Sequence, residues 1–222
     1  MTGSLISRGG VILTLGLALA LPAGTSAQAS DASAGHALTT VALGSPGRSG
    51  PRVRCVAHKD RYAARARRMA HAIDAQLAGR LSTVGLKETD TKTGITCTYH
   101  ASTHFYAASA IKVTILAALL RKAQEQHRKL TATERQLAWL MITQSDNNAA
   151  TALWNDVGFS HMQHFLNVAK MKHTKLARAW GLSLLTAHDE VLLLKIVSRS
   201  NRILSEASRD YAQFLMSRVI AS

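Results

Sequence analysis

The feature that most constrains the fold of this chain is the apolar run over residues 113–120. It lies near the start of a longer segment, residues 110–129, that becomes charged toward its end. A helix that is apolar on all of its faces is stable only inside a core. We therefore expect the first turns of a helix over residues 110–129 to be buried by other helices and its last turns to be exposed.

Helix-capping residues follow this segment at short intervals. Thr131 and Glu134 have the spacing of a capping box for a helix that ends near residue 144. The same reasoning predicts helices over residues 147–154, ended by Gly158, over 160–171, capped by Ser160, over 186–197, capped by Thr186 and Asp189, and from Ser205 almost to the end of the chain.

The part of the chain before residue 110 contains fewer elements. Residues 58–78 have apolar positions three and four apart, which predicts an amphipathic helix closed by Gly79. Residues 80–87 and 95–100 have period-two character on either side of a polar turn, which predicts a β-hairpin. The expected fold class is α+β, with a helical subdomain packed on a small antiparallel sheet.

The N-terminus has the organisation of a signal peptide over residues 1–29. Arg8 is followed by an apolar stretch and by the cleavage site Ala27-Gln28-Ala29. The stretch is shorter than the roughly 20 residues that span a bilayer, although an uncleaved anchor is an alternative. We expect a secreted, extracytoplasmic protein without a membrane span, in which residues 30–55 are a flexible lead-in and residues 56–222 the folded domain.

Cys55 and Cys97 are the two cysteines of the chain. Because thiols often pair in an oxidising compartment, we expect a disulfide, with two free buried thiols as the alternative. His161 and His164 lie three residues apart, but a chance pair on a solvated helix face explains them better than a metal site. No metal and no cofactor are expected.

Lys and Arg outnumber Asp and Glu by 27 to 13, which gives a formal charge of +14. A basic surface attracts anions, so acidic cell-wall polymer is a candidate partner, and an ordinary soluble surface is the alternative. Nucleic acid is a weaker candidate, because aromatic residues make up only 5% of the chain and no recognition motif is present.

The motif Ser109-Ala110-Ile111-Lys112 begins the apolar helix. One helical turn brings the serine and lysine side chains together. A helix N-terminus favours negative charge on the seryl oxygen. Burial lowers the pKa of a lysine, so its neutral amine becomes accessible as a base. Because so short a motif also arises by chance, its position at the helix start is the informative part.

The motif Ser145-Asp146-Asn147 lies at the junction between two predicted helices. Side chains at such a junction can point into a cleft. These residue types also cap helices, which is an alternative that needs no function. The combination of the two motifs favours a functional site for serine acyl transfer.

With these motifs the chain resembles the class A serine β-lactamases and the related penicillin-binding D-alanyl-D-alanine peptidases. The resemblance covers roughly residues 58–222, and includes the segments 105–112 and 144–150, Trp180 and the helix start at Thr186. It implies a β-lactamase/transpeptidase-like fold. It also implies acyl-enzyme chemistry on a β-lactam or on an amide bond of a peptidoglycan stem peptide.

The resemblance implies a role for each motif residue. Ser109 would attack the carbonyl carbon, Lys112 would be the base, and Ser145 would pass a proton to the leaving nitrogen. Asn147 would hydrogen-bond both the substrate amide and Lys112. The backbone N–H of Ser109 would supply half of an oxyanion hole.

The chain departs from the family pattern in three places. The K-T-G motif should follow the S-D-N motif, whereas Lys92-Thr93-Gly94 precedes the nucleophile and falls in the predicted turn. No E-x-x-L-N segment, which carries the glutamate that activates the deacylating water, lies between Asn148 and Thr186. The sequence stops at Ser222, where the family continues, so we expect an incomplete domain whose C-terminal strands are missing.

We therefore expect an exported, monomeric serine hydrolase of a type linked to antibiotic resistance, in which deacylation is slow. The alternative is a catalytically degenerate module that binds anionic cell-wall polymer. Whether Ser109 can be acylated distinguishes the two.

Overall fold

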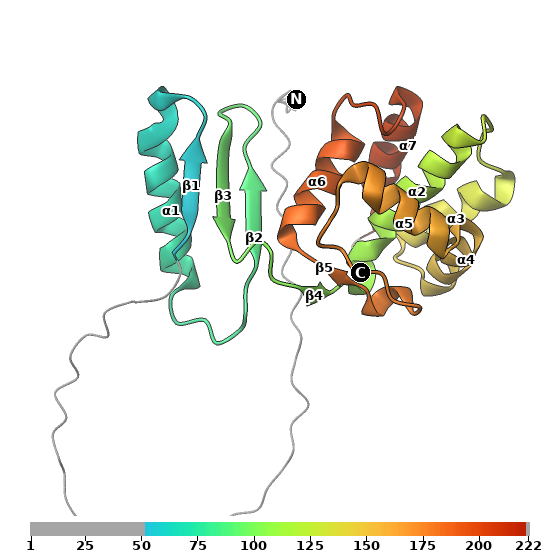
Figure 1. Cartoon of the computed structure of the whole chain (residues 1–222), viewed down its shortest axis with the longest axis horizontal. Helices are drawn as coiled ribbons and strands as arrows, with labels where there is room; N and C mark the ends of the chain where they lie inside the picture. The colour runs from blue at the N-terminus through green and yellow to red at the C-terminus, as the bar shows by residue number, and fades with distance from the viewer. Residues whose placement is uncertain (1–51, 221–222) are drawn as a thin grey trace, which may run out of the picture.

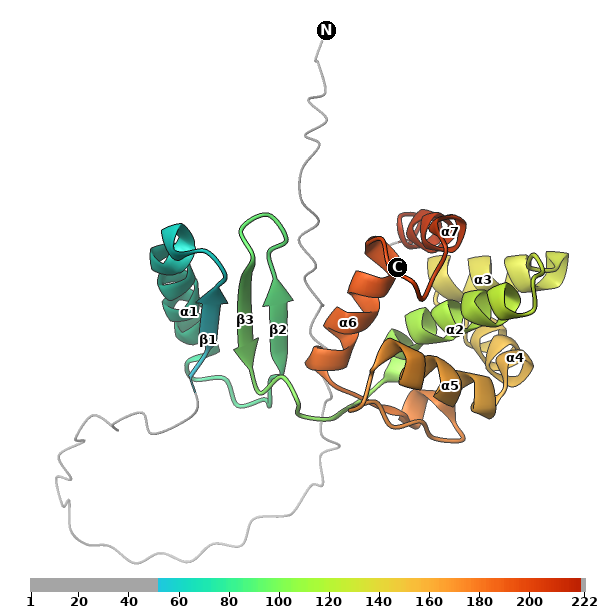
Figure 2. The ribbon, with the colours of Figure 1, turned by 45° about the horizontal axis from the view of Figure 1, so that its top comes forward.

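A small antiparallel sheet lies beside a group of packed helices in the computed structural model, which describes residues 52–220 (Figure 1, Figure 2). The α+β class, with a helical part packed against a small sheet, is confirmed. The predicted signal peptide and most of the predicted lead-in lie outside the described residues.

The sheet has the strand order β1–β3–β2, in which β1 is Arg54–Ala57, β2 is Leu86–Thr89 and β3 is Ile95–Tyr99. β2 and β3 form the predicted hairpin, although β2 begins six residues later than the predicted strand. The helix α1 (Ala63–Leu77) follows a short 3-10 turn, η1 (Asp60–Tyr62), and packs on β1 and β3.

The strand β1 corrects one sequence prediction. The flexible lead-in was expected to extend through residue 55, but Arg54 and Cys55 begin β1 and lie opposite Thr98 and Cys97 of β3. β1 is four residues long and its pairing partner lies about 40 residues away in the chain, so no local pattern marks it as a strand. The folded domain therefore includes these two residues.

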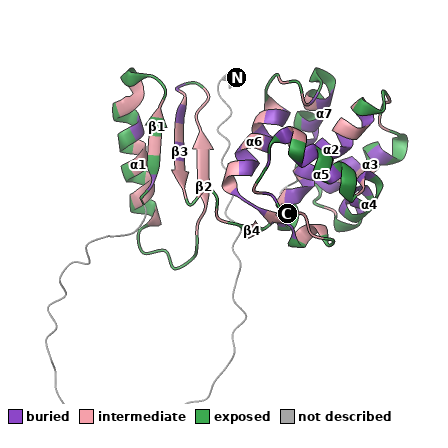
Figure 3. Ribbon diagram, in the orientation of Figure 1, coloured by how far each residue is buried: buried purple, intermediate pink, exposed green. Residues whose placement is uncertain are grey.

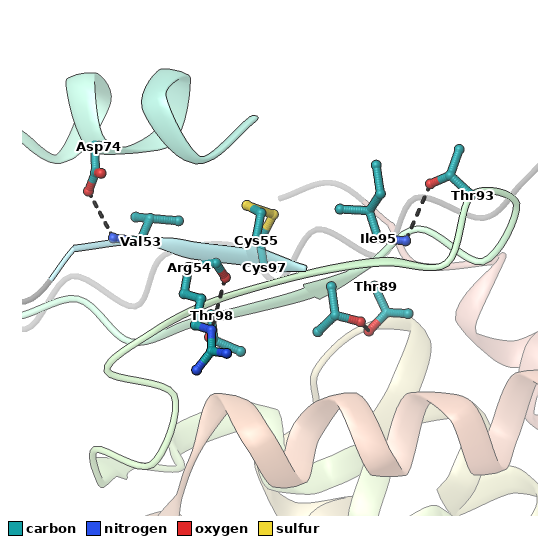
Figure 4. Close-up of a disulfide and its surroundings, with 10 residues drawn as sticks. Val53, Arg54, Cys55, Asp74, Thr89, Thr93, Ile95, Cys97 and Thr98 are labelled. Atoms are coloured by element: carbon teal, nitrogen blue, oxygen red, sulfur yellow. Dashed lines mark hydrogen bonds between the residues drawn. A yellow bond between two sulfur atoms is a disulfide. The ribbon is translucent and has the colours of Figure 1, made fainter. Parts of the chain in front are cut away.

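A disulfide joins β1 to β3. Cys55 and Cys97 lie opposite each other in the register of the two strands, and their sulfur atoms are bonded (Figure 4). The apolar cluster between α1 and the sheet contains only three buried residues, Ala66, Ile95 and Cys97. Because so small a cluster buries little apolar surface, the covalent link is an important restraint on this part of the molecule.

The other described elements follow β3 in the chain. They are β4 (Phe105–Tyr106), η2 (Ala108–Ala110), α2 (Ile111–Glu125), α3 (Ala132–Thr143), α4 (Asn147–Val157), α5 (Phe159–Ala169), η3 (Trp180–Leu182), β5 (Leu184–Leu185), α6 (Ala187–Ser198) and α7 (Glu206–Met216). β4 and β5 pair as a separate two-stranded ladder. No helix within residues 52–220 is both long enough and apolar enough to cross a membrane.

The helix α2 is the centre of the larger core, as the apolar run predicts. Ile115, Leu116 and Leu119 are completely buried, and α3, α4, α5, α6 and α7 all contact α2 or one another around it (Figure 3). Toward its end α2 becomes accessible, with Glu125 as its last residue. The predicted change from a buried start to an exposed end is confirmed.

Most predicted helix caps are present. Thr131 and Glu134 form the complete capping box of α3, and Thr186 and Ser205 cap α6 and α7. The prediction for Ser160 is wrong. Gly158, with a φ of +78°, both ends α4 and begins α5, so the helix has already started at the preceding residue and needs no serine cap.

A buried carboxyl group lies in α6. Glu190 is 4% exposed, and its Oε1 has no hydrogen-bond partner among residues 52–220. Burial raises the pKa of Glu190 from 4.5 to about 7, and the Asp189 carboxylate adds to this shift. The folded protein therefore keeps a proton on Glu190 at pH values where the unfolded chain has lost it.

Glu190→Gln should weaken the pH dependence of the free energy of unfolding. A folded-state pKa above the unfolded value means that stability is fully present below pH 4.5 and is lost as the pH rises through about 7. A shift of this size corresponds to at most about 3 kcal/mol. Denaturant titrations at about pH 5 and about pH 8 measure the loss in wild type and variant.

Glu206→Gln, which removes an exposed carboxylate at the start of α7, is the matched control. An equal loss of stability with rising pH in the wild type and in Glu190→Gln would contradict the prediction.

Candidate active site

Backbone pairing holds the segment that carries Ser109. β4 pairs with β5, and Ala107 donates its backbone N–H to the Ser183 carbonyl at 2.8 Å. Ser109 then lies in η2 and is exposed, whereas Lys112 is the second residue of α2 and only 3% exposed. The helical turn between them brings the Lys112 Nζ to 3.2 Å from the Ser109 Oγ.

Lys112 connects the two sequence motifs. Its Nζ lies 2.9 Å from the Ser145 Oγ, 2.5 Å from the Ser145 carbonyl oxygen and 2.8 Å from the Asn147 Oδ1. With the Ser109 Oγ, four oxygens surround one nitrogen. An ammonium group can donate to three of them at once, whereas a neutral amine donates to two and accepts from a hydroxyl. The surroundings therefore suit both protonation states of the amine.

Ser145 lies between α3 and α4 in an unusual backbone conformation. Its φ is +53°, in the left-handed region that residues other than glycine adopt at a cost. In this conformation its carbonyl and its hydroxyl both contact Lys112, and the hydroxyl donates to the Ser109 Oγ at 3.1 Å. Such backbone strain is often found at functional sites.

The motif of Ser145, Asp146 and Asn147 combines both of its predicted interpretations. Asp146 caps α4 by accepting a hydrogen bond from the Ala149 backbone N–H at 2.6 Å. Ser145 and Asn147, on either side of it, contact Lys112. The helix cap thus fixes the backbone from which the two polar side chains reach the amine.

Burial lowers the pKa of Lys112 below its ordinary value, and attraction to the Asp146 carboxylate opposes part of that change. Removing a charged amine from water disfavours its protonated form. The direction is the one that a lysine base requires, because it increases the fraction of neutral amine near neutral pH.

Trp180, in η3, lies over Lys112. The Lys112 Nζ is 5.3 Å from the centroid of a Trp180 ring, and the indole N–H donates to the Thr151 Oγ1 at 3.0 Å. The Thr151 hydroxyl in turn donates to the Asn147 carbonyl at 2.9 Å. Sequence reasoning named Trp180 only within the family resemblance, because no spacing indicates a contact between positions 112 and 180.

The segment Lys92-Thr93-Gly94 is not brought to this site. Asp90 accepts hydrogen bonds from the backbone N–H groups of Lys92 and Thr93 and from the Thr93 hydroxyl, and Gly94 has a φ of +72°. In both views this turn is at the end of the hairpin opposite to β4, which leads to Ser109 (Figure 1, Figure 2). The segment belongs to the turn of the β2–β3 hairpin, as predicted.

A family model described as the beta-lactamase enzyme family matches the chain over residues 67–134 and 124–220. The chain belongs to this family. The first matched segment contains Ser109 and Lys112, and the second contains Ser145 and Asn147. No match was found among curated proteins.

Solved structures of class A β-lactamases have the same fold. The structure of a representative of class A β-lactamase from Bacteroides cellulosilyticus DSM 14838 is 19% identical, with a TM-score of 0.60, and the match covers 69% of each chain. A β-lactamase from Streptosporangium roseum is 23% identical, with a TM-score of 0.56, over 71% of this chain and 70% of that chain.

The β-lactamase from Sphaerobacter thermophilus DSM 20745 is 20% identical, with a TM-score of 0.60, over 67% of this chain and 68% of that chain. At these sequence identities the similarity establishes the fold and does not identify a substrate. The β-lactamase-like fold is confirmed.

Asp146→Asn should lower the pKa of Lys112 further, because it removes the carboxylate that stabilises the ammonium form. Asparagine keeps a side-chain oxygen for the cap of α4, so the helix start should be retained. The measurement is an NMR titration of the Lys112 side chain. Asp156→Asn, which changes a carboxylate beside Lys122 instead, is the control. An unchanged Lys112 pKa in Asp146→Asn would count against this account.

Proposed function

We propose that this chain is an exported serine hydrolase that forms an acyl-enzyme with a β-lactam or a D-alanyl peptide. The observation that carries the proposal is the position of the Lys112 Nζ, within hydrogen-bond distance of the hydroxyls of both Ser109 and Ser145. A serine hydroxyl is a weak nucleophile until a base takes its proton. Membership of the β-lactamase family supports hydrolase chemistry at this serine.

In the proposed reaction, neutral Lys112 accepts the Ser109 proton while the Ser109 Oγ bonds to the substrate carbonyl carbon. Negative charge then develops on the carbonyl oxygen, toward which the Ser109 backbone N–H donates. The proton passes from Lys112 through the Ser145 hydroxyl to the substrate nitrogen, and the bond between carbon and nitrogen breaks. Asn147 holds the amine through its Oδ1 and offers its amide N–H to the substrate.

Differences in exposure support the proposed direction of attack. Ser109, Ser145 and Asn147 are exposed, so a substrate can reach all three, whereas Lys112 lies behind them. The base is thus separated from bulk water while the nucleophile remains accessible. The disulfide between Cys55 and Cys97 is consistent with the oxidising compartment that export implies.

A fluorescent penicillin should label wild-type protein at Ser109, with Ser109→Ala and Lys112→Ala both unlabelled. Ser145→Ala should label about 10²–10⁴-fold more slowly, because proton delivery to the leaving nitrogen is lost. Time-resolved labelling followed by peptide mass spectrometry gives both the rate and the modified residue.

Ser160→Ala is the matched control for serine removal, since Ser160 is exposed on α5 and caps no helix. Its labelling rate should equal that of the wild type. Absence of any adduct on correctly folded wild-type protein would overturn the proposed function.

The same site leads us to propose that the acyl-enzyme is long-lived. Between residues 149 and 186 the only carboxylate is Asp156, and it lies 3.9 Å from Lys122, near the end of α2 opposite to Ser109. Trp180 covers one side of the Lys112 amine, and its aromatic ring cannot take a proton from water. Residues 149–186 therefore offer the proposed machinery no carboxylate that could activate water for deacylation, and the nearby Asp146 caps α4.

Labelled protein should keep its added mass long after free penicillin has been removed. Intact-mass analysis over time, after rapid desalting, measures the decay of the adduct. Release of hydrolysed penicillin at the rate of labelling would contradict the long-lived intermediate while leaving the serine hydrolase assignment in place.

A further inference from the structure

A cluster of two imidazoles and one carboxylate lies apart from the residues used above. His173 is in the loop between α5 and η3, and His188 and Asp189 are in the first turn of α6. One ligand atom from each residue lies within 4.8 Å of the other two. We propose that these three residues bind a divalent transition-metal ion of the zinc type.

The carboxylate of Asp189 is held in a fixed position. It is completely buried, and its Oδ2 accepts hydrogen bonds from the backbone N–H groups of His173 and Thr174 at 2.8 and 2.7 Å and from the Thr174 hydroxyl at 2.9 Å. Three donors contact Oδ2, whereas within residues 52–220 the one hydrogen-bond contact of Oδ1 is the His188 Nδ1 at 3.3 Å. The carboxylate is therefore oriented by one oxygen and has the other available as a ligand.

The separation of these two atoms fits a shared ion. Zinc binds nitrogen and oxygen ligands at about 2.0–2.1 Å, and a tetrahedral arrangement then places neighbouring ligand atoms about 3.3 Å apart. The Asp189 Oδ1 and the His188 Nδ1 are at this separation. The rings of His173 and His188 lie edge to face, with centroids 5.4 Å apart, and a ring nitrogen of His173 within 4.8 Å of the other two atoms is the third candidate ligand.

The backbone around the cluster is anchored on both sides. The backbone N–H of His188 donates to the Ala101 carbonyl at 2.9 Å, and the Nε2 of His104 lies 2.7 Å from the His173 carbonyl oxygen. Neither contact uses a proposed ligand atom. The two segments that carry the ligands are thus held together without a metal, which reduces the ordering that an ion has to impose.

The ligand types select the class of ion. Imidazole suits Zn²⁺, Cu²⁺ and Ni²⁺, whereas Mg²⁺ and Ca²⁺ prefer sets made of oxygen alone. Lys87 and Lys195 are near enough to interact electrostatically with each other, and Lys87 also with Asp189. Their positive charge opposes a cation, so we expect binding weaker than that of a four-ligand structural zinc site.

No metal site was predicted from the sequence. The histidine pair that was weighed as a metal site, His161 and His164, has a different environment, because the His164 Nε2 lies 2.9 Å from the Glu125 Oε1 on α2. His173 and His188 are 15 residues apart in the sequence, and the fold brings them together where Asp189 binds the backbone of the loop that carries His173.

The test is a calorimetric titration of the whole chelator-treated chain with ZnCl₂. We expect one site, which His173→Ala and His188→Ala each weaken by at least about tenfold. His161→Ala, which removes another histidine of the chain, should leave the affinity unchanged. Because Asp189 is buried and ties a loop to α6, its replacement would confound folding with binding and is not used.

Thermal unfolding with and without ZnCl₂ is the second measurement, since an ion that binds only the folded state raises the unfolding temperature. The increase should be lost in both ligand variants and kept in His161→Ala and in Ser109→Ala. No binding by the wild type, or binding that persists in both His173→Ala and His188→Ala, would overturn the site. Neither readout depends on hydrolase activity.

Discussion

The arrangement of the candidate active site depends on the contacts of the Lys112 amine. Placing an ionisable group at 3% exposure is unfavourable unless polar atoms replace the lost water. Ser109, Ser145 and Asn147 supply those atoms from η2, the α3–α4 junction and α4. Three separate elements are therefore fixed relative to one another by one nitrogen, and the proposed catalytic residues are also the residues that satisfy the buried amine.

The molecule has two hydrophobic cores of unequal size. The helices around α2 enclose a large continuous apolar cluster, whereas α1 and the sheet share a cluster with only three buried residues. The disulfide lies in the smaller one. The residues of the candidate active site lie on elements of the larger core, and β2 of the sheet contacts α6.

The sequence predicted the elements whose signals are local. The capping box at Thr131 and Glu134 and the apolar run of α2 each involve residues that are close in the sequence. The S-x-x-K spacing likewise corresponds to one helical turn. β1 and the β4–β5 ladder were missed because each is at most four residues long and forms only through a distant partner. The position of Trp180 was missed for the same reason, because its contact with Lys112 forms only when the chain folds.

The segment between α5 and α6, which contains only the short elements η3 and β5, is held in place by hydrogen bonds near both of its ends. At its start, Asp189 of α6 binds the backbone of residues 173 and 174, and near its end the buried Ser183 accepts a hydrogen bond from the Ala177 backbone N–H at 3.0 Å. Trp180 lies between these two anchors and is tied to Thr151. Because both ends are fixed, the ring is held at a defined place over Lys112. The loop therefore contributes the Trp180 ring, and no carboxylate, to the wall of the proposed active site, which agrees with the proposal of a long-lived acyl-enzyme.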